Sequence, residues 1–303
     1  MHRLSNFQLF AICVLIWSTT WHAIVYQIAE VAPEWSVALR FSLAGVLVLA
    51  GCRWHALRLH FSPRAHALFA LQGVFMYSLS YICVYHAELH VPSGLVAVGF
   101  SASPLLSGLG AWLLWRSPLP ARFVAGGVAG VAGVALIFWP EFGQVGAAAA
   151  RGAAFTAAAV LLATVGGLLV HAGARRDTPF WPSLGYSLFY SSLCSAALAW
   201  LAGLPLVLPS SVQWWGSLAY LVLAGTVVAF ACWLTLQQRL GPGKAGTVGV
   251  ATPVLALVVS AAFEGYRPDP LTALGVVLAL AGNVMMLRSR ASGPAPNPNP
   301  TAS

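Results

Sequence analysis

Charged residues are scarce in this chain, and their scarcity excludes a water-soluble globular protein. Asp, Glu, Lys and Arg make up 7% of the 303 residues, whereas soluble domains carry about 25%. Hydrophobic residues reach 59%, and the mean hydropathy is +0.81. The 15 basic and 7 acidic residues are too few to cover a surface of this size in water. Lipid is therefore the expected solvent for most of the surface.

Motifs that would indicate several other functions are also missing. The chain has no HExxH or GxSxG sequence and no paired acidic residues inside an apolar run, so no enzyme is expected. It has no GxxxxGKS/T sequence, which excludes transport driven by ATP hydrolysis on this chain. The five cysteines lack metal-ligand spacing and are interpreted as small buried hydrophobes. The HAELH sequence at 86–90 offers two possible metal ligands but no third. We expect no cofactor and no metal.

Ten apolar runs of helix-spanning length are present instead. Each is close to the roughly 17–25 residues that cross a bilayer as a helix, and none shows the short alternating segments of a β-barrel. The sequence therefore predicts an all-α polytopic membrane protein with ten transmembrane helices. The runs are 7–28, 35–52, 65–87, 93–115, 123–139, 152–174, 181–204, 214–238, 245–263 and 271–287.

The basic residues predict the orientation of these helices. They occur singly or in small groups between apolar runs, never as a basic stripe, so no nucleic-acid partner is expected. If the N-terminus is cytoplasmic, twelve of them fall on the cytoplasmic side and only Arg151 and Arg267 on the other. An even number of spans then places both termini in the cytoplasm, in a cell inner (plasma) membrane. The twelve are Arg3, Arg53, Arg58, Arg64, Arg116, Arg122, Arg175, Arg176, Arg239, Lys244, Arg288 and Arg290.

An internal repeat divides the chain into residues 1–140 and 141–291, followed by a Pro- and Asn-rich tail at 292–303 that is expected to be disordered. PEW at 33–35 returns as PFW at 179–181, with an offset of 146. Five helices per half is an odd number, so the second half should be inverted relative to the first. Inverted repeats are a recurrent plan of secondary transporters. Three further pairs share an offset of 149: Pro104 and Pro253, Gly126 and Gly275, Gly133 and Gly282.

Two of the predicted helices carry stripes of small residues that permit close helix contact. Spacing alone does not decide whether the stripes pack within one chain or between two protomers, so we expect a monomer or a weak homo-oligomer. The stripes are Gly126, Gly130 and Gly133 in one helix and Gly275, Ala279 and Gly282 in the other.

Three segments resemble the drug/metabolite transporter superfamily, of the ten-helix EamA type. They are IWSTTWHAIVYQIAEVAPEWSVALRFSLAG at 16–45, PSGLVAVGFSASPLLSGLGAWLLW at 92–115 and GTVGVATPVLALVVSAAFEGYRPDPLTALGVVLALAGNVMML at 246–287. The resemblance implies metabolite export, and within the superfamily the chain is similar to bacterial amino-acid exporters, those for aromatic amino acids included. Family members often have Gly-Glu-Arg after the fourth helix, where this chain has Trp115-Arg116-Ser117-Pro118. The second half keeps Glu264.

Aromatic and polar residues deep in the runs are the candidate lining of a substrate path. Trp17 and Trp21 share one helical face, and Trp17 lies about 15 Å along its run at 1.5 Å per residue. Tyr77 and Tyr81 repeat this spacing. Interfacial anchoring or helix packing is the alternative, and His22 and His171 equally suit structural hydrogen bonds. The expected substrate-binding set is Trp17, Trp21, His22, Tyr77, Tyr81, Phe100, Ser103, His171, Trp233 and Gln237. Pro104 and Pro253 are candidate hinges or plain packing kinks.

Arg40 is the one charged residue inside the ten runs, about 8 Å from the end of its run. It could attract a substrate carboxylate, but we favour snorkelling or pairing with Glu30 or Glu34. No acidic residue lies near a midplane, which favours uniport or exchange over proton coupling, with a histidine as the remaining proton site.

Taken together, the sequence predicts a secondary exporter of small metabolites by alternating access, with aromatic or large neutral amino acids as the preferred substrates. Another metabolite or a drug is the alternative substrate. A non-transporting membrane scaffold is the rival function. The exporter predicts a central cavity between the halves, and the scaffold predicts packed halves without one.

Overall fold

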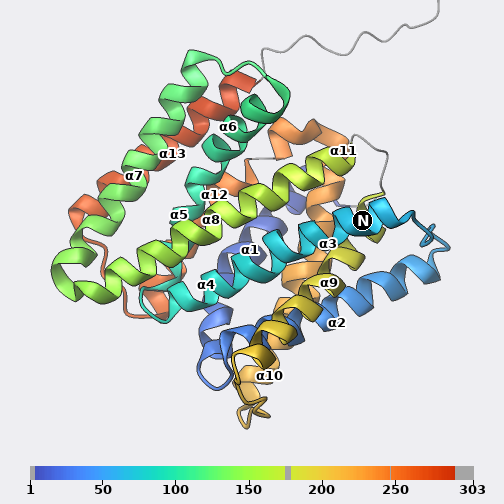
Figure 1. Ribbon diagram of the computed structural model, residues 1–303. Coiled ribbons are helices and arrows are strands. Elements are labelled where there is room, and N and C mark those ends of the chain that lie inside the picture. Colours follow the sequence, from blue (N-terminus) through green and yellow to red (C-terminus); the bar gives the residue numbers. More distant parts are fainter. Residues whose placement is uncertain (1–3, 175–178, 246, 291–303) are drawn as a thin grey trace, which may run out of the picture.

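The computed structural model describes residues 4–174, 179–245 and 247–290, and these residues fold into helices without a strand (Figure 1). Within these ranges nine helices are long and apolar enough to cross a membrane, and the shorter apolar helix Val248–Phe263 lies between the last two. The chain is therefore a multi-pass membrane protein. The predicted tail at 292–303 and three of the basic residues used for orientation, Arg3, Arg175 and Arg176, lie outside the described residues.

The predicted spans correspond to helices, some of them built from several segments. The first half contains α1 (Asn6–Ile28), α2 (Pro33–Trp54), α3 (Pro63–Gln72), η1 (Gly73–Leu79), α4 (Ser80–Glu88), α5 (Ser93–Gly99), η2 (Phe100–Ala102), α6 (Ser103–Trp115) and α7 (Ala121–Val145). The second half contains α8 (Ala147–Ala174), α9 (Phe180–Leu201), α10 (Val212–Val222), η3 (Leu223–Val228), α11 (Ala229–Ala245), α12 (Val248–Phe263) and α13 (Pro270–Arg290).

Local sequence explains where several helices begin and end. Ser5 caps α1 in a capping box, because its hydroxyl accepts from the Gln8 amide at 3.2 Å while the Gln8 side chain accepts from the Ser5 amide at 2.8 Å. Pro33 and Pro63 occupy first-turn positions of α2 and α3, where a missing amide hydrogen costs nothing. Arg116 ends α6 in the left-handed conformation, with φ of 54°.

Two of the spanning helices contain a π-helical segment in mid-course. α3 passes through η1 into α4, and α10 passes through η3 into α11. The two π-segments begin 150 residues apart, at Gly73 and Leu223. A π-turn adds one residue to a helical turn and frequently occurs at functional sites, and both segments lie beside the cavity described below.

Helices of the first half pack mainly on helices of the second half. The most extensive contacts join α7 to α13 and α2 to α9, and α1 packs on α12 and on α10–α11. α12 runs parallel to α1, since Ser18 bonds to Thr252 at 3.0 Å and, further along both helices, His22 lies 2.9 Å from Glu264. We call the end of the bundle where α1 begins and α13 ends the terminal end, and the opposite end the distal end.

The glycine stripes meet each other within the chain, which settles the choice that spacing left open. A Cβ atom on Gly133 would lie 2.5 Å from the Ala279 amide nitrogen and 2.6 Å from the Gly275 carbonyl oxygen. A Cβ atom on Gly282 would lie 2.3 Å from the Gly126 carbonyl oxygen. The backbones of α7 and α13 therefore touch, and these faces are not free for a second protomer.

The two candidate hinge prolines differ in their surroundings. Pro104 follows the 3-10 segment η2, which interrupts the fourth span between α5 and α6. Pro253 lies inside α12, which is α-helical throughout. The break in regular helix is thus confined to the first of the two prolines.

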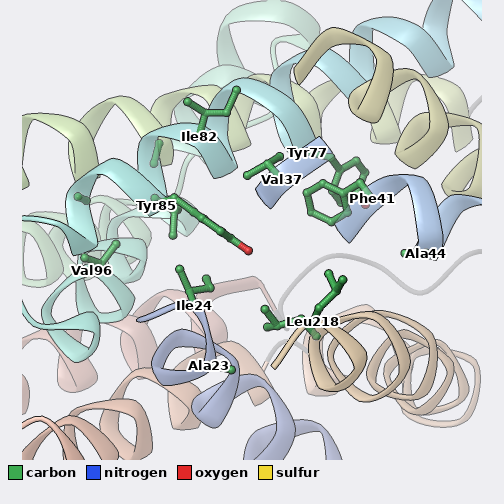
Figure 2. Packing of buried hydrophobic residues seen from close by; sticks show 14 of the residues in the cluster. Ala23, Ile24, Val37, Phe41, Ala44, Tyr77, Ile82, Tyr85, Val96 and Leu218 are labelled. Atoms are coloured by element: carbon green, nitrogen blue, oxygen red, sulfur yellow. The ribbon is translucent and has the colours of Figure 1, made fainter. Parts of the chain in front are cut away.

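A buried hydrophobic cluster surrounds the middle of the bundle (Figure 2). Phe41 and Tyr77 pack edge to face with ring centroids 5.7 Å apart. Tyr85 enters from α4, and in Figure 2 its hydroxyl oxygen points toward the side of Phe41 and Tyr77. Ile24 of α1 and Leu218 of α10 close the cluster from the other side.

Candidate functional site

A cavity of about 470 Å³ lies between the two halves. Ligand pockets commonly occupy about 300–1,000 Å³. Its wall extends from Ile24 and Val84 toward the terminal end, where Val250 in the first turn of α12 and Leu287 in the last turn of α13 contribute. Its aromatic members are Trp17, Trp21, Tyr77, Tyr81, Phe100, Phe123, Phe230 and Trp233.

Three aromatic rings, those of Trp17, Phe230 and Trp233, form one wall of this cavity. The Trp17 ring lies 5.5 Å from the Phe230 ring and 6.3 Å from the Trp233 ring. Phe180 supports this group from behind, with its centroid 6.3 Å from Phe230. Edge-on and tilted arrangements at these distances are the favourable geometries for aromatic pairs. The wall is therefore a packed aromatic surface contributed by α1 and α11 and supported by Phe180 of α9.

Trp17 is held by a hydrogen bond across the two halves. Its indole Nε1 donates to the Gly225 carbonyl oxygen at 3.2 Å. Gly225 belongs to the π-segment η3, and a Cβ atom there would lie 2.8 Å from the Thr20 methyl group. Because the indole proton is used by the protein, Trp17 offers a substrate its ring face rather than a donor.

Another part of the wall carries Tyr81, whose ring lies 4.9 Å from that of Phe41 in a T-shaped contact. Tyr77 also lines the cavity, but only 4% of its surface is exposed. Trp21 pairs with Phe100 of η2 at 5.3 Å. Tyr77 is thus mainly a core residue, whereas Trp21, Phe100 and Tyr81 are half-buried at the cavity edge.

Arg40 lies in the cavity wall and is 3% exposed. Its guanidinium carbon stands 4.9 Å from the Tyr81 ring centroid and 5.1 Å from that of Phe41. Nη1 donates to the Tyr85 hydroxyl at 3.5 Å, and Nε has no partner among the described residues. Cation–π contacts contribute about 0.5–2 kcal/mol, less than the several kcal/mol that desolvating one ion costs.

The two carboxylates expected to pair with Arg40 are engaged elsewhere, so the pairing predicted from the sequence is wrong. Glu30 accepts from the Ser210 amide at 2.7 Å and from the Ser211 amide at 3.3 Å. Glu34 accepts from His86 at 2.8 Å. Arg40 faces inward instead of snorkelling to the distal end.

The remaining polar side chains of the wall mostly bond to backbone carbonyls. Ser80 donates to the Ala159 carbonyl at 2.8 Å, and Asn283 donates through Nδ2 to the Ala279 carbonyl at 3.0 Å. Thr252 bonds back to Val248 at 2.8 Å. The Ser103 hydroxyl is buried and has no partner among the described residues. No Asp or Glu is among the described residues that line this cavity.

At the distal end of the bundle, Glu264 joins the two halves through hydrogen bonds. Its carboxylate accepts from the Ser93 amide at 2.9 Å, from the Ser260 hydroxyl at 2.8 Å and from the Ser93 hydroxyl. His22 Nδ1 lies 2.9 Å from Glu264 Oε1. A Cβ atom on Gly94 would approach the Leu257 Cα at 2.8 Å, so α5 and α12 touch here. A carboxylate at the start of α5 also complements the helix dipole.

Seven of the ten residues predicted to bind substrate line the cavity, together with both prolines. The seven are Trp17, Trp21, Tyr77, Tyr81, Phe100, Ser103 and Trp233, and the prolines are Pro104 and Pro253. The other three lie elsewhere. His22 follows Trp21 by one residue, about 100° around α1, and therefore faces Glu264. His171 stands near the end of α8, its ring 5.0 Å from Trp115. Gln237 lies one turn beyond Trp233, outside the lining.

Other lining residues were not in the predicted set, and three of them had a weak signal in the sequence. Phe230 follows Tyr81 by 149 residues, the offset that relates Pro104 to Pro253. Asn283 is a polar residue in the tenth apolar run, where facing lipid would be costly. Arg40 was identified by its charge, but snorkelling or pairing with an acidic residue was favoured over a place in the substrate path. In the HAELH sequence, His86 bonds to Glu34 at 2.8 Å, and the described part of the chain contains no group of three or more possible metal ligands.

Comparisons with known proteins agree on one family. The model of the EamA-like transporter family matches residues 6–139 and 150–288. A protein of Archaeoglobus fulgidus named an uncharacterized transporter is 24% identical over 92% of this chain and 98% of its own length. A Streptantibioticus cattleyicolor protein named a probable terminal-alkyne amino-acid exporter is 28% identical over 76% of each chain. One crystal structure superposes with a TM-score of 0.68 at 20% identity, over 94% of this chain and 98% of that one. At that identity the likeness shows the fold alone.

Proposed function

Because this chain belongs to the EamA-like transporter family, we propose that it is a secondary exporter of aromatic or large neutral amino acids. That it is a transporter and not an enzyme follows from the family. The substrate, the direction and the mechanism are the proposal. The observation that carries it is the cavity of about 470 Å³ between the halves, lined by aromatic residues from both of them.

The chemistry of the wall supports a substrate with a flat or apolar side chain. Rings at Trp17, Phe230 and Trp233 present faces and edges to the cavity, and such surfaces bind apolar groups through area and through the ring quadrupole. The Streptantibioticus cattleyicolor relative supports amino acids as the class. The finer assignment to the aromatic-amino-acid exporter YddG rests on the resemblance alone, because the relatives compared above are distant transporters.

The proposed mechanism is alternating access between the two halves of an inverted repeat. Its support is the offset of about 149 residues, which recurs at the π-segments η1 and η3, and the pairing of α2 with α9 and of α7 with α13. In this proposal the Glu264 network, which joins the halves at the distal end, keeps that end shut while the cavity reaches toward the terminal end. Export requires these bonds to break as the terminal end closes.

The proposed setting is the inner (plasma) membrane, with both termini in the cytoplasm and lipid around the bundle. The chain acts alone or as a weak homo-oligomer in this proposal, since the Gly133 and Gly282 contacts already lie within one chain. Uniport or exchange is favoured over proton coupling because the described lining contains no carboxylate. His22 cannot serve as a proton site in the cavity itself, because it bonds to Glu264 outside it.

Another metabolite or a drug remains the alternative substrate, and the aromatic wall suits apolar drugs as well as amino acids. The scaffold function predicted halves packed without a cavity. The lined space between them therefore favours transport over a scaffold.

The test is flux of a labelled amino-acid panel in proteoliposomes, with and without a pH gradient. We expect saturable flux of phenylalanine and tryptophan that is indifferent to the gradient. It should fall at least tenfold in Trp17→Ala, and less in Tyr77→Ala, because Tyr77 exposes only 4% of its surface. Trp200→Ala, at a tryptophan that is 75% exposed, is the matched control. Folded protein that moves no amino acid above the level of empty liposomes would refute the substrate assignment.

A further inference from the structure

The strongest unexplained group in the molecule is the Arg40 guanidinium. An arginine is charged at every physiological pH and carries five N–H donors in a planar fork. Only one of these donors has a hydrogen-bond partner within the described chain, the Tyr85 hydroxyl at 3.5 Å. Only 3% of the surface of Arg40 is exposed, and the residue lines the cavity.

The aromatic residues around Arg40 leave one direction open. The guanidinium carbon lies 5.1 Å from the Phe41 ring centroid and 4.9 Å from that of Tyr81. Because these two centroids are only 4.9 Å apart, both rings lie on the same side of the guanidinium. Nη2 lies on the side of the π-segment η3, 3.9 Å from where a Cβ atom on Gly225 would stand. The absence of a side chain at Gly225 keeps that edge of the guanidinium clear, beside the ring of Trp17.

One acidic residue, Glu88, is a candidate internal partner and has to be weighed. Its carboxylate is buried, and neither oxygen has a hydrogen-bond partner in the described chain. The described residues form two ion pairs within 4.0 Å, His22 with Glu264 and His86 with Glu34, and Arg40 is in neither. Glu88 lines the separate distal pocket next to Glu264, while Arg40 lines the central cavity. Glu88 therefore does not satisfy the donors of Arg40.

We propose that Arg40 binds the carboxylate of the transported solute, and that this carboxylate is the polar group the cavity requires. An arginine fork matches a carboxylate with two parallel hydrogen bonds. The neighbouring Trp17 and Tyr81 rings then receive the apolar part of the same solute. The inference rests on the proposed function and narrows its substrate class to hydrophobic carboxylates.

The same wall predicts what the site does not require. No carboxylate faces the cavity from any described residue, so an α-ammonium group would find only hydroxyl, amide and carbonyl acceptors. A solute that keeps the carboxylate and lacks the ammonium group therefore loses no ion pair. The cavity should accept aromatic carboxylic acids as readily as the corresponding amino acids.

The test is competition against uptake of labelled phenylalanine into proteoliposomes by three unlabelled compounds. These are L-phenylalanine, 3-phenylpropionate, which lacks the ammonium group, and L-phenylalaninamide, which lacks the carboxylate. We expect the first two to compete within about threefold of each other and the amide to be at least tenfold weaker. Binding of the same compounds to the purified protein, measured by calorimetry, gives the ranking without transport.

Variants then assign the ranking to Arg40. In Arg40→Met the preference for phenylalanine over its amide should fall to within about twofold, and Arg40→Lys should keep part of it. Arg64→Met, at an exposed arginine, should rank the compounds as wild type does. The double variant Arg40→Met with Glu88→Gln removes both buried charges, so it separates ligand binding from charge balance. It should lose the preference for phenylalanine over its amide as fully as Arg40→Met does.

The outcomes distinguish this inference from the proposed function. An amide that competes as well as phenylalanine, or a 3-phenylpropionate that does not compete, overturns the role of Arg40 and leaves amino-acid export standing. Recovery of wild-type ranking in the double variant likewise overturns it. If none of the three compounds competes or binds, both proposals fail.

Discussion

The indole nitrogen of Trp17 in α1 donates a hydrogen bond to the carbonyl oxygen of Gly225 in the π-segment η3. At 3.2 Å this bond fixes one of the three indole rings of the cavity to a helix of the other half. A change in the relative position of the halves must therefore move Trp17 or break the bond. The ring thus both lines the cavity and connects the halves.

Trp17→Phe keeps an aromatic ring and removes this hydrogen bond, whereas Trp17→Ala removes both. A hydrogen bond of this kind contributes about 0.5–1.5 kcal/mol, so we expect Trp17→Phe to retain transport with a modestly lower melting temperature. Trp17→Ala should lose transport at least tenfold. Flux assays and thermal unfolding in detergent measure the two effects separately. Equal loss of transport in both variants would show that the bond, and not the ring face, is what matters.

Gly133 is predicted to tolerate no side chain. A Cβ atom there would lie 2.5 Å from a backbone nitrogen of α13, so even Gly133→Ala must push α7 and α13 apart. We expect a melting temperature several degrees lower and a poor yield of monodisperse protein, in line with the 1–3 kcal/mol typical of overpacking. Gly167→Ala is the control, since nothing lies within 4 Å of a Cβ atom there. Unchanged stability in Gly133→Ala would contradict the packing of α7 on α13.

Glu264 is predicted to make stability depend on pH at the acidic end. Burial alone would raise the pKa of its carboxyl group, but hydrogen bonds from Ser93, His22 and Ser260 outweigh burial and hold the pKa below its usual 4.5. A lowered pKa means that the folded protein binds fewer protons than the unfolded chain. The stabilisation is therefore present above the unfolded pKa and is lost as pH falls through the folded pKa.

The measurement is the melting temperature of wild type and Glu264→Gln between about pH 3 and pH 7. Wild type should be the more stable at neutral pH, because hydrogen bonds to a charged acceptor are stronger than those to an amide. The difference should shrink as pH falls below about 4.5. Ser93→Ala, which removes a donor but keeps the acid, should weaken the pH dependence. A difference between wild type and Glu264→Gln that does not vary with pH would contradict this role.

The orientation of the bundle is tested by labelling from outside the cell. Leu208 is 81% exposed in the distal loop between α9 and α10. The cysteine of a Leu208→Cys variant should therefore react with an impermeant maleimide added to intact cells. Arg58 lies in the terminal loop between α2 and α3. The cysteine of an Arg58→Cys variant should react with the maleimide only after the membrane is permeabilised. Both variants are made in a background without the five native cysteines. The reverse pattern would place the termini outside.

Hydropathy predicted the spans well because the bilayer requirement is local to each segment. The runs at 65–87 and 93–115 correspond to helical spans over Pro63–Glu88 and Ser93–Trp115. The π-segments were not predicted, since a π-turn and an α-turn have the same apolar composition. One of them begins at Gly73, which packs directly against the backbone of Ser187 in α9, a contact between distant segments that composition does not reveal.

The cavity wall was predicted in part for a related reason. Spacing of i and i+4 identified the shared face of Trp17 and Trp21, but it does not reveal which distant residue faces it, such as Phe230. The role of Arg40 depended on whether Glu30 and Glu34 were free to pair with it. Each of those acids has a partner far away in the sequence, Ser210 in one case and His86 in the other, and no local pattern encodes that.

The contact between α7 and α13 has a consequence for how the protein is made. The ribosome synthesises α7 long before α13, so for most of translation the glycine face of α7 has no helix to cover it. A nascent chain that ends before residue 270 would expose the glycine face of α7 to lipid or to a neighbouring nascent chain. Synthesis of α13 is therefore the step that covers the glycine face of α7. Premature termination within α13 should lead to degradation of the product.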